Sequence, residues 1–134
     1  MKSSLVDTDI LSEFFRGNLK VVGNANKYLQ THNSIKLSII TYYEILNGLL
    51  YKDAKNQLKK FTEFVELNEV IFLTMRATRI SAEIYAGLRK LGKPIGHTDS
   101  LIAGIALAND LQLVTNNTEH FKRVKGLEII NWLK

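Results

Sequence analysis

Three carboxylates, far apart in the sequence, stand where predicted strands give way to helices. Asp7 ends the first strand-like run. Glu44 opens one predicted helix, and Asp99 opens another, over residues 100–109. Because a parallel sheet gathers the carboxyl ends of its strands at one crevice, we expect these acids to lie together. Carboxylates held close together resist ionisation, and Mg²⁺, which prefers oxygen ligands, relieves their repulsion. The pattern therefore predicts a metal-dependent site for phosphoryl chemistry.

Each acid taken alone also fits a purely structural role. Residues 41–44 match the capping-box pattern, in which Glu44 would satisfy a backbone N–H group at the start of a helix. Asp7, Asp9 and Asp99 could each cap a helix or occupy its first turn. A single metal site explains the three strand-end acids more economically than three separate caps, and we therefore favour the metal site.

Polar residues also follow the fourth strand-like run, residues 111–115. Asn117 could offer its carbonyl oxygen to a metal ion, directly or through water, and Glu119 could add negative charge nearby. The same stretch is also typical of a turn that leads into a helix N-cap. The three histidines are poor catalytic candidates, and no two of them have the spacing of zinc ligands.

The alternation of strand-like and helix-like runs predicts an α/β fold with a mostly parallel central sheet. We expect strands over residues 3–7, 36–40, 70–73, 111–115 and 127–130. We expect helices over residues 10–16, 26–31, 41–51, 56–67, 77–91 and 100–109. The last helix is apolar nearly all round, which predicts that it is buried. Because no linker or low-complexity tract interrupts the chain, we expect one domain over residues 1–134.

Composition excludes several classes of protein. The 134 residues are 46% hydrophobic and 23% charged, which is typical of a globular chain and not of a disordered one. The absence of cysteine excludes a disulfide framework and a thiolate metal site. No glycine-rich phosphate loop is present, so nothing supports binding of a nucleoside triphosphate or a dinucleotide. No secretory signal or membrane-length apolar run is visible, and we expect a cytoplasmic protein.

The net charge of +5 favours a polyanionic partner, because basic side chains displace the counterions of nucleic acids. Basic residues gather in three places, at residues 52–60, 76–79 and 89–93. Most of them fit solvated helix faces, but as a set they could follow a phosphate backbone near the crevice. Three tyrosines between residues 42 and 51 could stack on bases, although such residues more often fill a core or an interface.

Several segments, taken in order, resemble one known protein family. They are Val-Asp-Thr-Asp at residues 6–9, Glu44 after Ser-Ile-Ile-Thr, Gly-His-Thr-Asp-Ser-Leu-Ile-Ala at residues 96–103 and Leu-Val-Thr-Asn-Asn-Thr-Glu-His-Phe at residues 113–121. In this order and spacing they resemble the PIN-domain ribonucleases, and more narrowly the VapC toxins of bacterial and archaeal toxin–antitoxin pairs. Residues 123–132 also look like the carboxyl terminus of a VapC toxin, so the resemblance covers essentially the whole chain.

The resemblance implies an α/β/α sandwich and an endoribonuclease that depends on Mg²⁺ or Mn²⁺. The metal-binding acids of the family fall on Asp7, Glu44 and Asp99, and its fourth catalytic position, often an aspartate, falls on Asn117. In-line attack of water on the RNA would leave a 5′-phosphate and a 3′-hydroxyl. The implied partners are RNA such as tRNA, a small VapB-like antitoxin that wraps the groove, and a second copy of the chain in a homodimer. A membrane is not implied.

Two other functions stay open at this point. A haloacid-dehalogenase-type phosphatase also begins with a strand that ends in Asp-x-Asp, as in Asp7-Thr8-Asp9, and would use Asp7 as its nucleophile. Such an enzyme needs a lysine and a late acidic pair, yet Asn116 and Asn117 stand where those acids belong. Alternatively, the uncharged Asn117 is compatible with a nucleic-acid or partner-binding module that has weak or no nuclease activity.

Overall fold

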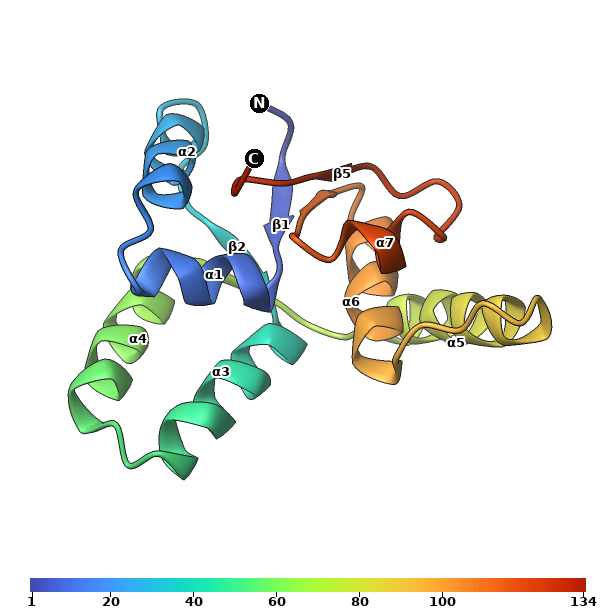
Figure 1. Ribbon diagram of the computed structural model, residues 1–134, viewed down its shortest axis with the longest axis horizontal. Helices are drawn as coiled ribbons and strands as arrows, with labels where there is room; N and C mark the ends of the chain where they lie inside the picture. Colours follow the sequence, from blue (N-terminus) through green and yellow to red (C-terminus); the bar gives the residue numbers. More distant parts are fainter.

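The computed structural model describes residues 1–134 and has a five-stranded sheet at its centre, in the order β3-β2-β1-β4-β5 (Figure 1). The strands are β1 Ser4–Val6, β2 Lys36–Ser38, β3 Glu69–Ile71, β4 Gln112–Val114 and β5 Ile129–Ile130. All neighbouring strands run parallel to each other. The predicted parallel sheet is therefore confirmed, and each strand overlaps the stretch expected from the sequence.

Helices cover both faces of this sheet. They are α1 Thr8–Phe15, α2 Leu19–Leu29, α3 Ile39–Tyr51, α4 Lys55–Leu67, α5 Met75–Lys90, α6 His97–Ala108 and α7 Thr118–Phe121. Alternate strand residues point to opposite faces of a sheet. Leu5 and Leu113 accordingly belong to the core cluster under α5, α6 and α7, whereas Val6 and Val114 belong to the cluster under α1, α2 and α4. Figure 1 shows these two groups of helices on either side of β1, which confirms the predicted three-layer sandwich.

α6 is buried along most of its length, as its apolar sequence predicts. It packs against α5, and the two helices approach most closely at Gly104. A Cβ atom at Gly104 would lie 1.9 Å from Ser81 Oγ and 2.7 Å from the carbonyl oxygen of Ala77. Because only glycine permits this approach, Gly104 fixes the position of α6, and with it the position of Asp99 in the first turn of that helix.

All six helices expected from the sequence begin earlier in the chain than predicted, and the difference is largest for α2. α2 begins at Leu19 and not near residue 26, because the Asn18 side chain accepts hydrogen bonds from two backbone N–H groups of the first turn. α3 begins at Ile39, where Ser38 is the N-cap. No helix in the structure combines the length and the apolar character that crossing a lipid bilayer requires.

Candidate active site

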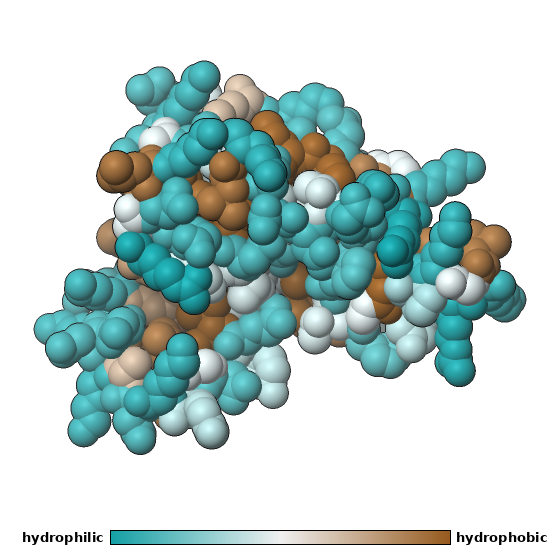
Figure 2. Space-filling model, viewed as in Figure 1, coloured by the Kyte–Doolittle hydropathy of each residue, from teal (hydrophilic) through white to brown (hydrophobic).

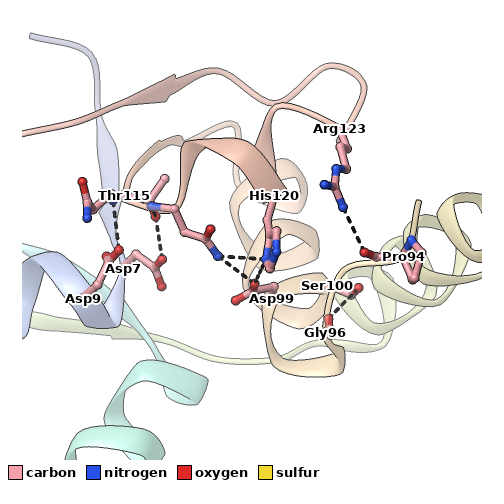
Figure 3. A network of polar contacts seen from close by, with 11 residues as sticks. Asp7, Asp9, Pro94, Gly96, Asp99, Ser100, Thr115, His120 and Arg123 are labelled. Carbon is pink, nitrogen blue, oxygen red and sulfur yellow. Dashed lines mark hydrogen bonds and ion pairs between the residues drawn. The ribbon is translucent and has the colours of Figure 1, made fainter. Parts of the chain in front are cut away.

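The register between β1 and β4 places Asp7 beside Thr115. Val6 pairs with Val114, so the next residue of each strand emerges at the same carboxyl edge of the sheet. Asp7 Oδ2 accepts a hydrogen bond of 2.8 Å from the Thr115 hydroxyl (Figure 3). Asp7 Oδ1 accepts one of 2.8 Å from the Thr8 N–H group. Asp7 is thereby both the N-cap of α1 and a buried carboxylate, with 5% of its surface exposed.

Asp99 reaches the same edge from the first turn of α6. This helix follows α5, so the expectation that a strand leads into Asp99 is wrong. Asp99 Oδ2 accepts a hydrogen bond of 3.1 Å from Asn117 Nδ2 and lies 3.1 Å from His120 Nδ1. The two nitrogen atoms are themselves 3.0 Å apart. The start of α7 therefore holds one oxygen of Asp99, and Figure 3 shows Asp99 beneath His120.

Asp9 joins the other two aspartates from the first turn of α1. Its Oδ1 accepts a hydrogen bond of 2.8 Å from the Ile10 N–H group, and its Oδ2 accepts one of 3.0 Å from the Asn116 N–H group. The alternative in which Asp9 is the N-cap is wrong, because Asp7 holds that position. Asp7, Asp9 and Asp99 together border what we call the acidic crevice.

The three aspartates repel one another in a poorly hydrated place. Burial, followed by the negative charges of Asp9 and then Asp99, raises the pKa of Asp7 from its ordinary value of 3.8 to about 7. Hydrogen bonds from Thr115 and Thr8 oppose this rise in the pKa only in part. Burial, with a smaller contribution from Asp99, also raises the pKa of Asp9. A bound cation would remove the repulsion, because an opposite charge favours the ionised form of a carboxyl group.

Glu44 is connected to the acidic crevice through Thr8. It lies in the second turn of α3, where its Oε1 accepts a hydrogen bond of 2.7 Å from the Thr8 hydroxyl. Thr8 Oγ1 also lies 2.9 Å from Thr41 Oγ1. The capping-box alternative for Glu44 is wrong, because Ser38 Oγ caps α3 and accepts the hydrogen bond from the Thr41 N–H group. The structure thus places a fourth carboxylate next to the crevice but shows no direct hydrogen bond between it and the aspartates.

The oxygen atoms of the crevice suit a magnesium-like ion. No group of three or more His, Cys, Asp or Glu side chains has the geometry of a complete metal site. Mg²⁺, however, usually takes only one or two carboxylates from a protein and completes its shell with water and substrate phosphates. Each oxygen of Asp7 accepts a single hydrogen bond, and Asp99 is held only through Oδ2. Both carboxylates therefore keep lone pairs for an ion.

His120 lies at the candidate site, although the sequence pattern did not indicate it. Its ring is 43% exposed and contacts Asp99, although all three histidines are poor candidates by sequence. One signal was available: Asn117 and His120 are three residues apart, which places two side chains on the same side of a helical turn. Glu119 faces solvent instead and pairs with Lys122 at 2.9 Å, and this hydrogen bond and charge hold the pKa of Glu119 below its usual range.

The crevice lacks the further groups that the phosphatase alternative requires. No lysine forms a hydrogen bond or an ion pair with Asp7, Asp9 or Asp99. The stretch after β4, residues 115–117, supplies a hydroxyl and two amides and no late acidic pair. The arrangement therefore fits carboxylates that hold a metal ion better than it fits an aspartate nucleophile.

The chain is similar in sequence to known proteins over nearly its whole length. The PIN domain model matches residues 4–127 of this chain. Ribonuclease VapC2 of Rickettsia felis is 31% identical over 131 residues, which cover 97% of this chain and 98% of that protein. The tRNA(fMet)-specific endonuclease VapC of Shigella flexneri is 29% identical over 98% of this chain and 99% of its own length.

Solved structures of VapBC proteins share the fold over nearly the full length. VapBC2 from Rickettsia felis, bound to a DNA fragment from its promoter, matches with a TM-score of 0.85 and 30% identity over 96% of this chain and 98% of the other. DNA-bound VapBC from Salmonella typhimurium matches with a TM-score of 0.86 and 27% identity, covering 98% and 99%. The resemblance seen in the sequence is confirmed: the chain belongs to the PIN-domain family and, within it, to the VapC ribonucleases.

Proposed function

We propose that the acidic crevice binds a divalent metal ion and hydrolyses RNA phosphodiester bonds, with this chain as the toxin of a toxin–antitoxin pair. One observation carries the proposal: three aspartates without a lysine or arginine partner meet at one edge of the sheet in a chain of the VapC family. Clusters of carboxylates with raised pKa values gather at functional sites. The tRNA(fMet)-specific relative supports tRNA as the first substrate to examine.

In this proposal Asp7 and Asp99 hold the ion, and Asp9 adds negative charge beside it. When bound, the ion would lower the pKa of a water molecule and polarise the phosphate that the water attacks. Thr115 and Thr8 each donate a hydrogen bond to one oxygen of Asp7, so that this carboxylate keeps a single orientation. Hydrogen bonds of this kind tune a metal site nearly as strongly as the ligands do.

Asn117 and His120 orient Asp99 in the same way. Both contact Asp99 Oδ2, which leaves Oδ1 for the ion. The side-chain amide oxygen Oδ1 of Asn117 has no hydrogen-bond partner within the chain, so it can accept a hydrogen bond from a water molecule at the crevice. Glu44 uses Oε1 for the Thr8 hydroxyl, and its Oε2 is available to position water or to ligate the ion.

The test is cleavage of total small RNA by the purified protein in the presence of Mg²⁺, of Mn²⁺ and of EDTA. We expect discrete products in both metal-containing reactions and none in EDTA. Asp99→Asn is the matched control, because it keeps the shape of the side chain and removes its charge. RNA left intact by folded, metal-loaded and antitoxin-free protein would overturn the nuclease proposal and favour the binding module.

We further propose that a VapB-like antitoxin binds this toxin in the cytoplasm and that the toxin forms a homodimer. The similarity to VapBC structures supports the antitoxin. An apolar stripe on α3 supports the homodimer, because Tyr43, Leu50 and Tyr51 are 63%, 55% and 88% exposed, and exposed apolar patches mark protein interfaces. Sedimentation of the protein alone, and then after coexpression with the product of the adjacent gene, tests both. A protein that stays monomeric on its own would contradict the homodimer.

A further inference from the structure

A cleft opens directly beside the acidic crevice, between α1, α3 and α4. Its volume is about 450 Å³, which lies within the range of clefts that bind small ligands. Thr8 and Glu44, which are joined by a hydrogen bond of 2.7 Å, both line it. Because Thr8 directly follows Asp7, the cleft and the acidic crevice share a border.

The charged groups that line this cleft are mostly basic. Arg16, Lys52 and Lys60 line it, and Glu44 is its only carboxylate. Arg16 pairs with Glu13, but neither lysine takes part in an ion pair. Both lysines are exposed to solvent. The cleft therefore offers two uncompensated positive charges next to a site that is otherwise acidic.

Apolar side chains, including Phe15, Ile45, Leu49 and Phe61, line the cleft together with the polar Ser12 and Gln57. The Phe15 side chain is 38% exposed, whereas Phe61 is buried. Figure 2 shows apolar atoms ringed by hydrophilic side chains in the part of the view where Figure 1 places α3 and α4. Aromatic surfaces next to positive charge are typical of sites for single-stranded nucleic acid, because every base has a face that can stack.

We propose that this cleft binds the stretch of single-stranded RNA that leads into the acidic crevice. Lys52 and Lys60 contact its phosphates, and Phe15 supports a base. The inference rests on the proposed ribonuclease function, because it assigns a path to the substrate of that site. A second cleft, at the amino-terminal ends of β1 and β4, is lined by one lysine and two carboxylates and lacks this positive charge.

The test compares two double variants that remove the same amount of charge. Lys52→Ala with Lys60→Ala removes the free cations of the cleft, whereas Lys20→Ala with Lys27→Ala removes two exposed lysines from α2, outside it. With labelled single-stranded RNA in EDTA, we expect the cleft variant to bind with a Kd about tenfold higher than wild type. The slope of log Kd against log salt should fall by about 1.4, roughly 0.7 for each of two phosphate contacts to a single strand, and the control should keep both values.

Measuring the binding in EDTA separates this inference from the nuclease proposal. If the wild type binds RNA but does not cleave it with Mg²⁺, the nuclease proposal fails. The ratio of the Kd values of the two double variants still shows whether the cleft binds RNA. Where cleavage occurs, we expect the cleft variant to raise KM for long RNA while kcat changes less than about twofold. A dinucleotide, which is too short to enter the cleft, should be cleaved alike by both variants.

Equal Kd and equal KM for the two double variants would overturn the proposal and leave a partner protein as the occupant of the cleft. Wild-type protein that binds no RNA in EDTA or with Mg²⁺ would overturn it as well.

Discussion

The amino-terminal edge of the sheet balances its charges, whereas the carboxyl edge does not. At the amino-terminal edge Lys2 pairs with Glu128, and Lys36 at the start of β2 lies 4.0 Å from Glu69 at the start of β3. The acidic partners are more than half exposed, and such pairs in water contribute at most about 1 kcal/mol each. This edge therefore carries its charges at little cost to the folded state.

At the carboxyl edge, the three aspartates of the acidic crevice meet without a lysine or arginine partner. Burial and mutual repulsion raise the pKa of Asp7 to about 7, so ionising this group costs the folded protein stability. Like charges are kept together in this way where a bound ion or substrate compensates them. The same strands thus carry balanced charges at one edge and, in the proposed function, a metal site at the other.

The largest effect expected at the carboxyl edge is the loss of cleavage in Asp7→Asn. This substitution removes the charge and keeps the size of the side chain, so the fold should persist while the metal ion is lost. Stabilisation by a metal ion is worth several kcal/mol, so we expect the rate to fall about a thousandfold or more. Single-turnover cleavage measures the rate, and a thermal unfolding curve verifies the fold. Metal-dependent cleavage at the wild-type rate would contradict the assigned role of Asp7.

The same variant should have the opposite effect on stability. Asp7 has a pKa of about 7 in the folded protein against an ordinary 3.8, so the folded state holds this proton more tightly than the unfolded chain. Its favourable contribution is complete below pH 3.8 and is lost as the pH rises to about 7.

We therefore expect the free energy of unfolding of the wild type, measured with urea in EDTA, to fall by a few kcal/mol over this range. The Asp7→Asn profile should be flatter, and the variant should be the more stable protein at mildly alkaline pH. Parallel profiles for the two proteins would show that Asp7 titrates alike in the folded and unfolded states.

An intermediate effect on cleavage is expected when a residue that orients Asp99 is changed. Asn117→Ala removes one of the two groups that orient Asp99 Oδ2 and leaves the carboxylates themselves in place. Loss of such a supporting group typically lowers metal affinity or activity by about 10- to 100-fold. Lys122→Ala, at the end of α7, is the control on the same segment and should cleave like the wild type. Equal cleavage rates for the two variants would show that Asn117 does not contribute to the site.

The smallest effect is expected at the amino-terminal edge. Lys36→Ala breaks the pair with Glu69, and we expect the free energy of unfolding to fall by at most about 1 kcal/mol. Cleavage and metal affinity should not change, because this pair lies at the opposite end of the strands. A loss of activity in Lys36→Ala would mean that the two edges are not independent.

The layers of the fold could be predicted because their signals are local. Leu5 and Val6 alternate between the two faces of the sheet, and the apolar run of α6 has no side that suits water. Asp7 could be predicted for the same reason, since it follows the last residue of a buried strand. Each of these features can be predicted from a few consecutive residues.

The rest of the site depends on contacts between distant segments. The position of Asp99 depends on the close approach of Gly104 to Ser81. No local sequence pattern in α5 or α6 predicts this approach. Glu44 lies in the second turn of α3 because the capping residue is Ser38 and not Thr41, which the capping-box pattern had indicated. His120 reaches Asp99 only because α7 packs over the start of α6.

The central claim is that the aspartates of the acidic crevice hold a divalent ion, and calorimetric titration of Mn²⁺ into metal-free protein tests it most directly. The titration is run near neutral pH in two buffers with different ionisation enthalpies, for the wild type and for Asp99→Asn. We expect saturable binding with release of protons in the wild type, because ligands must be deprotonated to bind a metal, and loss of this binding in the variant. Binding of equal strength in both proteins, without proton release, would contradict the claim.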